Sequence, residues 1–182
     1  HVECSSAVSG RYVGVWSTRS IVLCEIVVHG SFVAAPPPTS PPALPPSPPP
    51  PNQALGRPVT SSSFGWNGEA HKAVDGLHNN GQYVDAASGV CAHTQTANPS
   101  WNWIVVDLQA QYTIEGIVLY ARNQIPIQGT GWTIRVGDTG TAADAVCKTP
   151  VNGYNSASPG SAVNVACSSA SSGRYIGVWS TR

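Results

Sequence analysis

The sequence carries little charge and no long apolar run. Only 10% of its 182 residues are charged, and the formal net charge is zero. This balance argues against binding to nucleic acid or to anionic membranes by electrostatic attraction. No run approaches the roughly 20 apolar residues of a membrane helix. The apolar run 21–28, IVLCEIVV, is shorter, contains Glu25 and is rich in β-branched residues, so it predicts a buried strand.

Motifs for catalysis, zinc binding and N-glycosylation are also missing. There is no CxxC pair, no GxSxG elbow, no HExxH helix and no P-loop, and the carboxylates form no obvious pair. We therefore expect neither a zinc site nor an enzyme. The sequence Asn98-Pro99-Ser100 has the proline that abolishes an N-glycosylation site, so any glycan is expected to be O-linked.

What the sequence does contain is a repeat. Residues 2–19 and 165–182 are identical at 15 of 18 positions, with an offset of 163 residues. A repeat at this distance indicates units of about one domain. Only the first copy continues, as SIVLCEIVVHG. We expect a window cut across a tandem array: 1–29 as the last strands of a preceding domain, 30–51 as a linker, and 52–182 as a domain without its last strand.

The number of cysteines is odd, and the array accounts for it. Cys4 corresponds to Cys167 by position in the repeat, so its partner would precede residue 1. We expect Cys147 to pair with Cys167 across neighbouring strands, and Cys91 to pair with a cysteine equivalent to Cys24 on the final strand. The alternative is a cytosolic protein with buried free thiols. The proline-rich linker argues against that alternative.

Residues 36–51 contain 11 prolines among 16 residues. Such a segment favours polyproline II at about 3.1 Å per residue, which gives a semi-rigid spacer of about 50 Å. A docking ligand for aromatic grooves is a second interpretation. The Ser-Pro-Pro-Pro-Pro and Thr-Ser-Pro-Pro sequences of this segment also resemble the hydroxyproline-rich glycoproteins of plant and green-algal walls. That resemblance implies hydroxylation or O-linked glycans on Pro36, Pro37, Pro38, Thr39, Ser40, Pro41, Pro42, Pro45, Pro46, Ser47, Pro48, Pro49, Pro50 and Pro51.

Residues 52–182 alternate short β-branched runs with turn residues. The runs WNWIVVDL, YTIEGIVLYA, GWTIRVGD, AVNVAC and GRYIGVWS are separated by Gly, Asn, Pro and Ser, and no stretch shows sustained helical periodicity. This pattern predicts an all-β sandwich. Without a strand equivalent to 21–28, a sheet edge and an apolar groove would stay open and invite strand addition.

Several separated motifs resemble one family in the right order. NQALGRPVTSSSF, AVDG (73–76), WNWIVVDLQAQYTIEGIVLYAR (101–122) and SGRYIGVWSTR, with LCEIVV from the first copy, are similar to the discoidin or coagulation-factor type C jelly roll. Within that group, CAHT (91–94), the following ANPSW and the final Cys-Glu are closest to the fucolectins, or F-type lectins. The resemblance implies a jelly-roll β-sandwich.

The resemblance also implies a sugar site. In fucolectins a histidine after the cysteine and two arginines on later loops hold fucose. His93 stands at the histidine, Arg122 at the first arginine, and Gln128 in place of the second. The adjacent cysteine pair of the family is replaced near 125–126. Alternatively, His93 and Arg122 are ordinary loop residues. Among the tryptophans, Trp66, Trp101, Trp103 and Trp132 are able to stack on sugars, but we expect Trp101 or Trp103, and Trp179, in the core.

A structural cation, usually Ca²⁺, is implied by the same family. The matching ligands are the carboxylates of Asp75 and Glu25 and the main-chain carbonyls of Lys72, Leu77 and Val90; a hard cation takes six to eight such oxygens. The alternative is that Asp75-Gly76 is simply a turn.

These features predict an extracellular structural subunit. Glycosylated rods would alternate with β-sandwich beads, each completed by the strand of a neighbouring copy, and such head-to-tail contacts propagate without limit. The alternative is a multivalent lectin for cell-surface or matrix glycans, which gains avidity from tandem weak sites. We expect no nucleic-acid partner and no membrane span.

Overall fold

The computed structural model describes much of the chain, with gaps. The described residues are 8–17, 21–33, 51–78, 90–95, 102–122, 131–152, 162–167 and 175–179, with the backbone alone for 8–17 and 175–179. The linker prolines up to Pro50, the glycosylation positions among them, and Gln128 lie outside these ranges, so the polyproline II rod stays a prediction.

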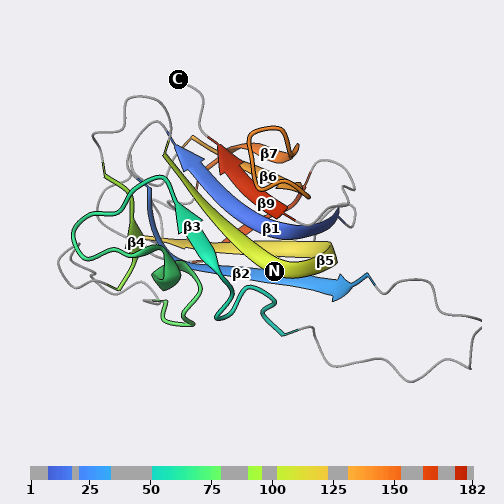
Figure 1. The fold of residues 1–182 in the computed structure, drawn as a ribbon, viewed down its shortest axis with the longest axis horizontal. Helices are drawn as coiled ribbons and strands as arrows, with labels where there is room; N and C mark the ends of the chain where they lie inside the picture. Colours follow the sequence, from blue (N-terminus) through green and yellow to red (C-terminus); the bar gives the residue numbers. More distant parts are fainter. Residues whose placement is uncertain are drawn as a thin grey trace, which may run out of the picture.

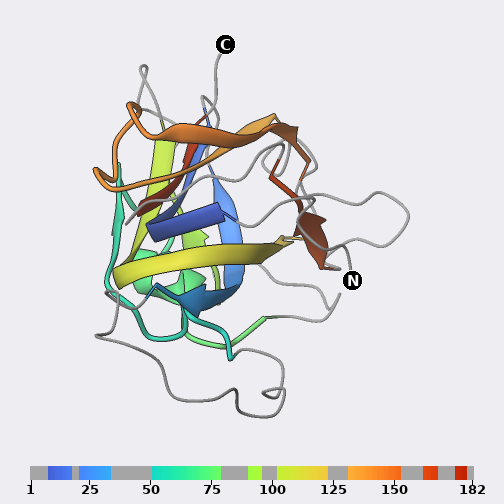
Figure 2. The same cartoon turned by 90° about the vertical axis from the view of Figure 1, so that its right-hand side faces the viewer.

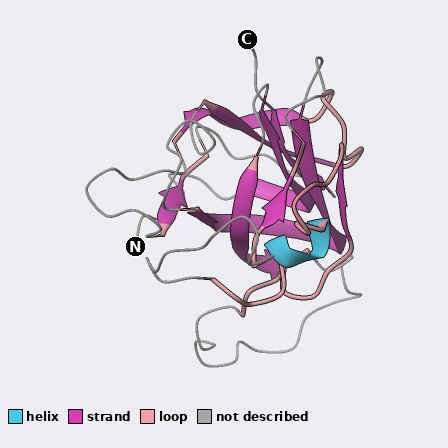
Figure 3. Ribbon diagram, turned by 90° about the vertical axis from the view of Figure 1, so that its left-hand side faces the viewer, coloured by secondary structure: helices cyan, strands magenta, loops and turns pink. Residues whose placement is uncertain are grey.

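The described part of the chain is built from strands, which confirms the all-β prediction. Every strand pair is antiparallel. One 3₁₀ turn, η1, lies beside the strands (Figure 3). In chain order the elements are β1 (Val8–Ser17), β2 (Val22–Phe32), β3 (Val59–Ser61), η1 (Ala70–Ala73), β4 (Ala92–His93), β5 (Asn102–Ala121), β6 (Trp132–Gly137), β7 (Ala145–Val151), β8 (Val163–Val165) and β9 (Tyr175–Trp179).

Strand β5 organises the sandwich because it turns a corner. The sequence predicts two strands here, and the structure joins them into one of 20 residues. Gln109, at the corner, has a φ of 65°, and its main-chain nitrogen donates to the Asp107 carboxylate at 2.6 Å. Figure 1 shows β5 running across the molecule, bending sharply and returning, and in Figure 2 its two halves cross at a steep angle. The first half pairs with β3 and β9, the second pairs with β2 and β8, and β1 pairs with both halves.

The N-terminal strand β2 is an integral part of this sandwich. It pairs with the second half of β5, with Ile26 opposite Leu119 and Val28 opposite Ile117, and its other neighbour is β4. Ile21, Leu23, Ile26 and Val28 are fully buried. The segment 21–28 therefore forms the buried strand that its composition predicts, and it seals the sheet formed by later residues of the same chain.

One apolar core fills the interior. Trp132 is its largest fully buried side chain, and Trp103 packs against its margin half-buried. Of the tryptophans expected in the core, Trp103 is therefore only at the edge, while Trp132 takes the central place. The side chains of Trp101 and Trp179 are not among those described. Fully buried members from both halves of β5 and from β6 are Ile104, Leu108, Ile114, Ile117, Leu119 and Ile134.

No helix in the described ranges is long and apolar enough to cross a membrane.

Candidate functional site

His93 lies in a position fixed by two strands and a loop. It belongs to β4, where it pairs with Val22 of β2. Its main-chain nitrogen donates to the Gly68 carbonyl at 2.9 Å, and its carbonyl accepts from the Gly65 nitrogen, also at 2.9 Å. The side chain is buried, with 5% exposure. The loop 65–68 therefore binds β4 like an additional strand and brings its own side chains over His93.

This loop needs unusual backbone conformations. Trp66 and Asn67 have φ angles of 51° and 55°, in the left-handed region that non-glycine residues seldom enter. At Gly68 a Cβ atom would lie 2.5 Å from the Cβ of His93 and 2.6 Å from its main-chain nitrogen. Only glycine allows so close an approach. The strained loop places Trp66 on the imidazole, with ring centroids 4.5 Å apart and planes 20° from parallel.

The electrostatics keep the imidazole of His93 neutral. Burial, and then the positive charge of Arg122, lower its pKa from 6.5 to about 4. Neither ring nitrogen has a hydrogen-bond partner among the described residues. A neutral imidazole offers one donor and one acceptor, and buried polar atoms normally have partners. Among the described residues, both nitrogens of the His93 ring therefore lack the partners that buried polar atoms normally have.

Arg122 follows the last residue of β5 and is also buried, with 7% exposure. Its charge acts on His93, so the structure brings together two of the three residues expected at the sugar site. The third, Gln128, lies outside the described residues. The structure also places Trp66 against His93. In the sequence, Trp66 was one of several tryptophans able to stack on a sugar. The signal for it was Gly-Trp-Asn-Gly at 65–68, a turn sequence that holds an aromatic residue.

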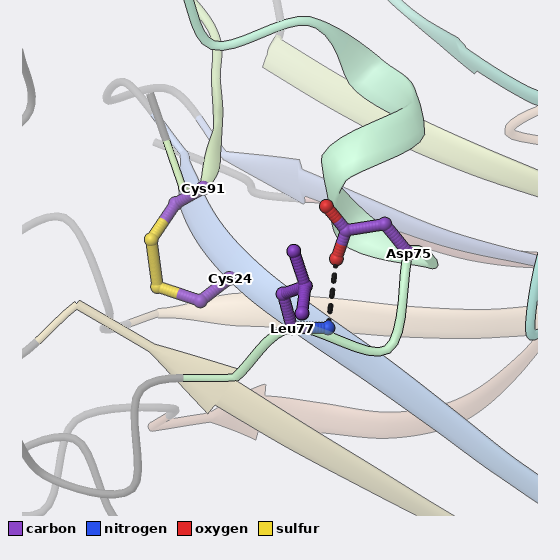
Figure 4. Close-up of a disulfide and its surroundings, with 4 residues drawn as sticks. All are labelled: Cys24, Asp75, Leu77 and Cys91. Carbon is purple, nitrogen blue, oxygen red and sulfur yellow. Dashed lines mark hydrogen bonds between the residues drawn. A yellow bond between two sulfur atoms is a disulfide. The ribbon is translucent and has the colours of Figure 1, made fainter. Parts of the chain in front are cut away.

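A second polar cluster surrounds Glu25, which is only 1% exposed. Its carboxylate accepts hydrogen bonds from the Gly76 main-chain nitrogen at 3.0 Å and from the Asn52 amide at 3.3 Å. Burial, and to a lesser extent the negative charge of Asp75, raise its pKa from 4.5 to about 7, although both hydrogen bonds oppose the shift. Asp75 accepts a bond from the Leu77 nitrogen at 2.9 Å (Figure 4). The buried carboxylate of Glu25 is therefore repelled by the negative charge of Asp75.

This arrangement fits a hard cation in its chemistry. Two carboxylates that repel each other are stabilised when a cation lies between them. No group of three or more His, Cys, Asp or Glu side chains suited to a metal occurs among the described residues. Further ligands would have to be main-chain carbonyls, as expected for Lys72, Leu77 and Val90. The turn at Asp75-Gly76 is also present, with Gly76 at a φ of 81°.

Two disulfides cross-link the described strands, and one of them joins the segments that carry Glu25 and His93. Cys24 of β2 is bonded to Cys91, 67 residues away, and Cys147 of β7 is bonded to Cys167, 20 residues away. Cys91 directly precedes β4, and Figure 4 shows this disulfide spanning from β2 to the neighbouring segment. The repeat in the sequence predicts a bond between Cys91 and a cysteine equivalent to Cys24 on a later strand. In the structure Cys24 itself is the partner.

Comparison with known proteins identifies the domain family. A family model described as NedA-like, galactose-binding domain, of the F5/F8 type C group, matches residues 72–178. No curated protein and no solved structure matches the chain significantly. The match covers more than half of the 182 residues and includes Asp75, His93 and Arg122. The chain therefore belongs to the NedA-like, galactose-binding domain family.

Proposed function

We propose that this protein is an extracellular carbohydrate-binding module with a fucolectin-like site formed by Trp66, His93 and Arg122. The observation that carries the proposal is the buried imidazole of His93, whose ring nitrogens have no partner among the described residues, beneath a half-exposed tryptophan and close to a cationic side chain. The two disulfides fit an oxidising compartment.

Each of the three residues has a separate role. His93 is neutral at pH 7 and donates one hydrogen bond and accepts another from sugar hydroxyls. Arg122 supplies donors of fixed geometry, which suit neighbouring hydroxyls or a ring oxygen. Trp66, with 53% exposure, offers apolar ring surface to the C–H groups of a sugar. Together they recognise a neutral monosaccharide rather than an anion.

The site is expected to bind weakly. Gln128 replaces the second arginine of the fucolectin pattern, and losing one charged hydrogen bond costs about 1.5–3 kcal/mol. We expect dissociation constants of about 1 mM or weaker, so useful binding would come from several linked copies.

Titration calorimetry with L-fucose and D-galactose tests this proposal. The wild-type chain is expected to bind at least one of the two sugars, and Trp66→Ala and His93→Asn each to weaken binding by about tenfold or more. His71→Asn is the matched control because His71 is an exposed histidine of η1. No heat of binding at the highest soluble sugar concentration, from a wild-type chain that unfolds cooperatively, would contradict the proposal.

We also propose a structural cation, Ca²⁺, between Glu25 and Asp75. It would neutralise the buried carboxylate and join β2 to the segment after η1. Its role would be to hold the loops near the disulfide Cys24–Cys91, with no part in chemistry.

A second candidate function is that of a bead in an extracellular fibre. The proline tract and the repeated 18-residue sequence support it. In this proposal 1–29 is the end of a preceding repeat, 30–51 is an O-glycosylated polyproline II rod, and neighbouring copies complete each other. Electron microscopy of native material is expected to show filaments with regular beads, and mass spectrometry is expected to show modified prolines. Dispersed particles and an unmodified tract would exclude it.

A further inference from the structure

Strands β1 and β9 pair with the same residues of β6 in the same register. Gly137 lies opposite both Tyr12 and Tyr175, and Ile134 lies opposite both Val15 and Val178. The pairing continues in step to Thr133, which lies opposite Trp16 and Trp179. Figure 1 draws the two arrows close together and running in the same direction. The two strands thus pair with the same residues of β6 in the same register.

The pairing on β5 shows that this is a single position. Val105 has three partners, Gly14 of β1, Thr60 of β3 and Gly177 of β9. Val106 likewise has Val13, Val59 and Ile176. A strand has only two edges for backbone pairing. Because β3 takes one edge, β1 and β9 are alternative occupants of the other.

The sequences explain why either strand is suitable. GRYVGVWSTR at 10–19 and GRYIGVWSTR at 173–182 differ only at Val13 and Ile176. Because side chains alternate between faces with period two, equal register presents equal residues to the same face. The single difference adds one methylene group, which is a small change in volume.

We propose that the position between β5 and β6 is an exchangeable strand-docking site whose partner is the matching strand of a second copy of this chain. The described residues contain two such strands and one such position. When one strand fills the position, the other is available to displace the matching strand from the equivalent position of another molecule. A one-way contact of this kind is heterologous and extends head to tail, whereas reciprocal exchange of the strands closes a dimer. This contact between copies is independent of sugar binding.

The lengths of the two ladders with β5 indicate which of the two strands pairs within its own chain. Strand β1 pairs with β5 along its whole length, from Val8 to Ser17, whereas β9 pairs with β5 only through Ile176 and Gly177. We therefore infer that β1 fills its own position, and that β9 is the strand available to a second molecule whose own β1 has left the position. Exchange conserves the number of paired strands, so mass action decides between monomer and oligomer.

Proline variants test whether the two strands are equivalent. Proline in the interior of a strand removes a ladder hydrogen bond and is not tolerated between two neighbours. Val178→Pro is expected to keep the wild-type Tm. Val15→Pro is expected to unfold cooperatively at a lower Tm because β9 then takes the position. The double variant is expected to lose its cooperative transition. If Val15→Pro alone abolishes folding, or if the double variant folds like wild type, β9 is no substitute and the inference is overturned.

Mixing experiments test exchange between molecules. The double variant, with its position vacant, is mixed with an isotope-labelled chain and analysed by native mass spectrometry. Wild-type chain, which has a spare strand, is expected to form a 1:1 complex, and the Val178→Pro chain, which has none, is not. A synthetic peptide of 173–182 is expected to restore cooperative unfolding to the double variant, and the same peptide with Val178→Pro is not. Equal capture of both labelled chains, or no capture and no rescue, overturns the proposal. Calorimetry with sugars reports on the other site and is unaffected by either result.

Discussion

Cys24 of β2 is covalently bonded to Cys91, 67 positions later in the chain. This bond fixes the strand that seals the sandwich to the segment that carries His93, two residues further on. Strand β2 thus carries both Cys24 and the buried Glu25. The proposed sugar site and the proposed cation site both depend on its position.

Removing this disulfide is expected to destabilise the protein more than removing the other. In the loop-entropy model, a bond that closes 67 residues contributes about 4 kcal/mol and one that closes 20 contributes about 3 kcal/mol. Urea unfolding of Cys24→Ala/Cys91→Ala and of Cys147→Ala/Cys167→Ala measures both losses. Equal stability of the first variant and wild type would show that β2 is held without its disulfide.

Calcium is expected to raise the Tm at pH values above 7, and EDTA to reverse the effect. The folded-state pKa of Glu25, about 7, exceeds its ordinary value of 4.5. Its contribution to stability is therefore present below pH 4.5 and is lost as the pH rises through 7. Without calcium, Glu25→Gln is expected to be more stable than wild type at pH 8, on the order of 1–2 kcal/mol, and to show no response to calcium.

Asp138→Asn, which changes an exposed carboxylate, is the control for that experiment and should respond to calcium as wild type does. A Tm of wild type that stays the same in calcium and in EDTA would exclude the cation.

Acid is expected to destabilise the protein through His93. The folded-state pKa, about 4, lies below the ordinary 6.5, so the unfolded chain binds a proton that the folded chain does not. Stability is therefore lost as the pH falls from 6.5 towards 4, by up to about 3 kcal/mol. Glu25 acts in the opposite direction between pH 4.5 and 7. The measurement is therefore the difference between wild type and His93→Asn at each pH, and a constant difference would refute the shift.

Gly68→Ala is expected to disrupt the proposed sugar site. The added Cβ would collide with the main chain and Cβ of His93, so loop 65–68 or β4 must move. We expect a loss of about 1–3 kcal/mol in stability and of the stacking of Trp66 on His93, seen as a change in tryptophan fluorescence. Gly116→Ala is the control because its Cβ would meet no atom within 4 Å. A Gly68→Ala protein with unchanged fluorescence and sugar affinity would place Trp66 outside the site.

Part of the proposed site was implied by the resemblance to the fucolectins, which matched His93 to the family's histidine and Arg122 to its first arginine. The role of Trp66 was not predictable in this way, because it depends on two left-handed residues and on Gly68 lying against β4. Gly65 is joined to His93 by a main-chain hydrogen bond that spans 28 positions, and such a contact has no periodic signature.

The alternation of β-branched residues with turn residues determined the all-β fold, and the run at 21–28 determined a buried strand, since both depend on local periodicity and composition. Only the tertiary structure decided that this strand packs on residues 112–121, that β5 is continuous around Gln109, and that Glu25 acts on Asp75. These depend on contacts between distant segments. The repeat was plain in the sequence, but its physical meaning, two strands for one place in the sheet, emerged only from the register on β5 and β6.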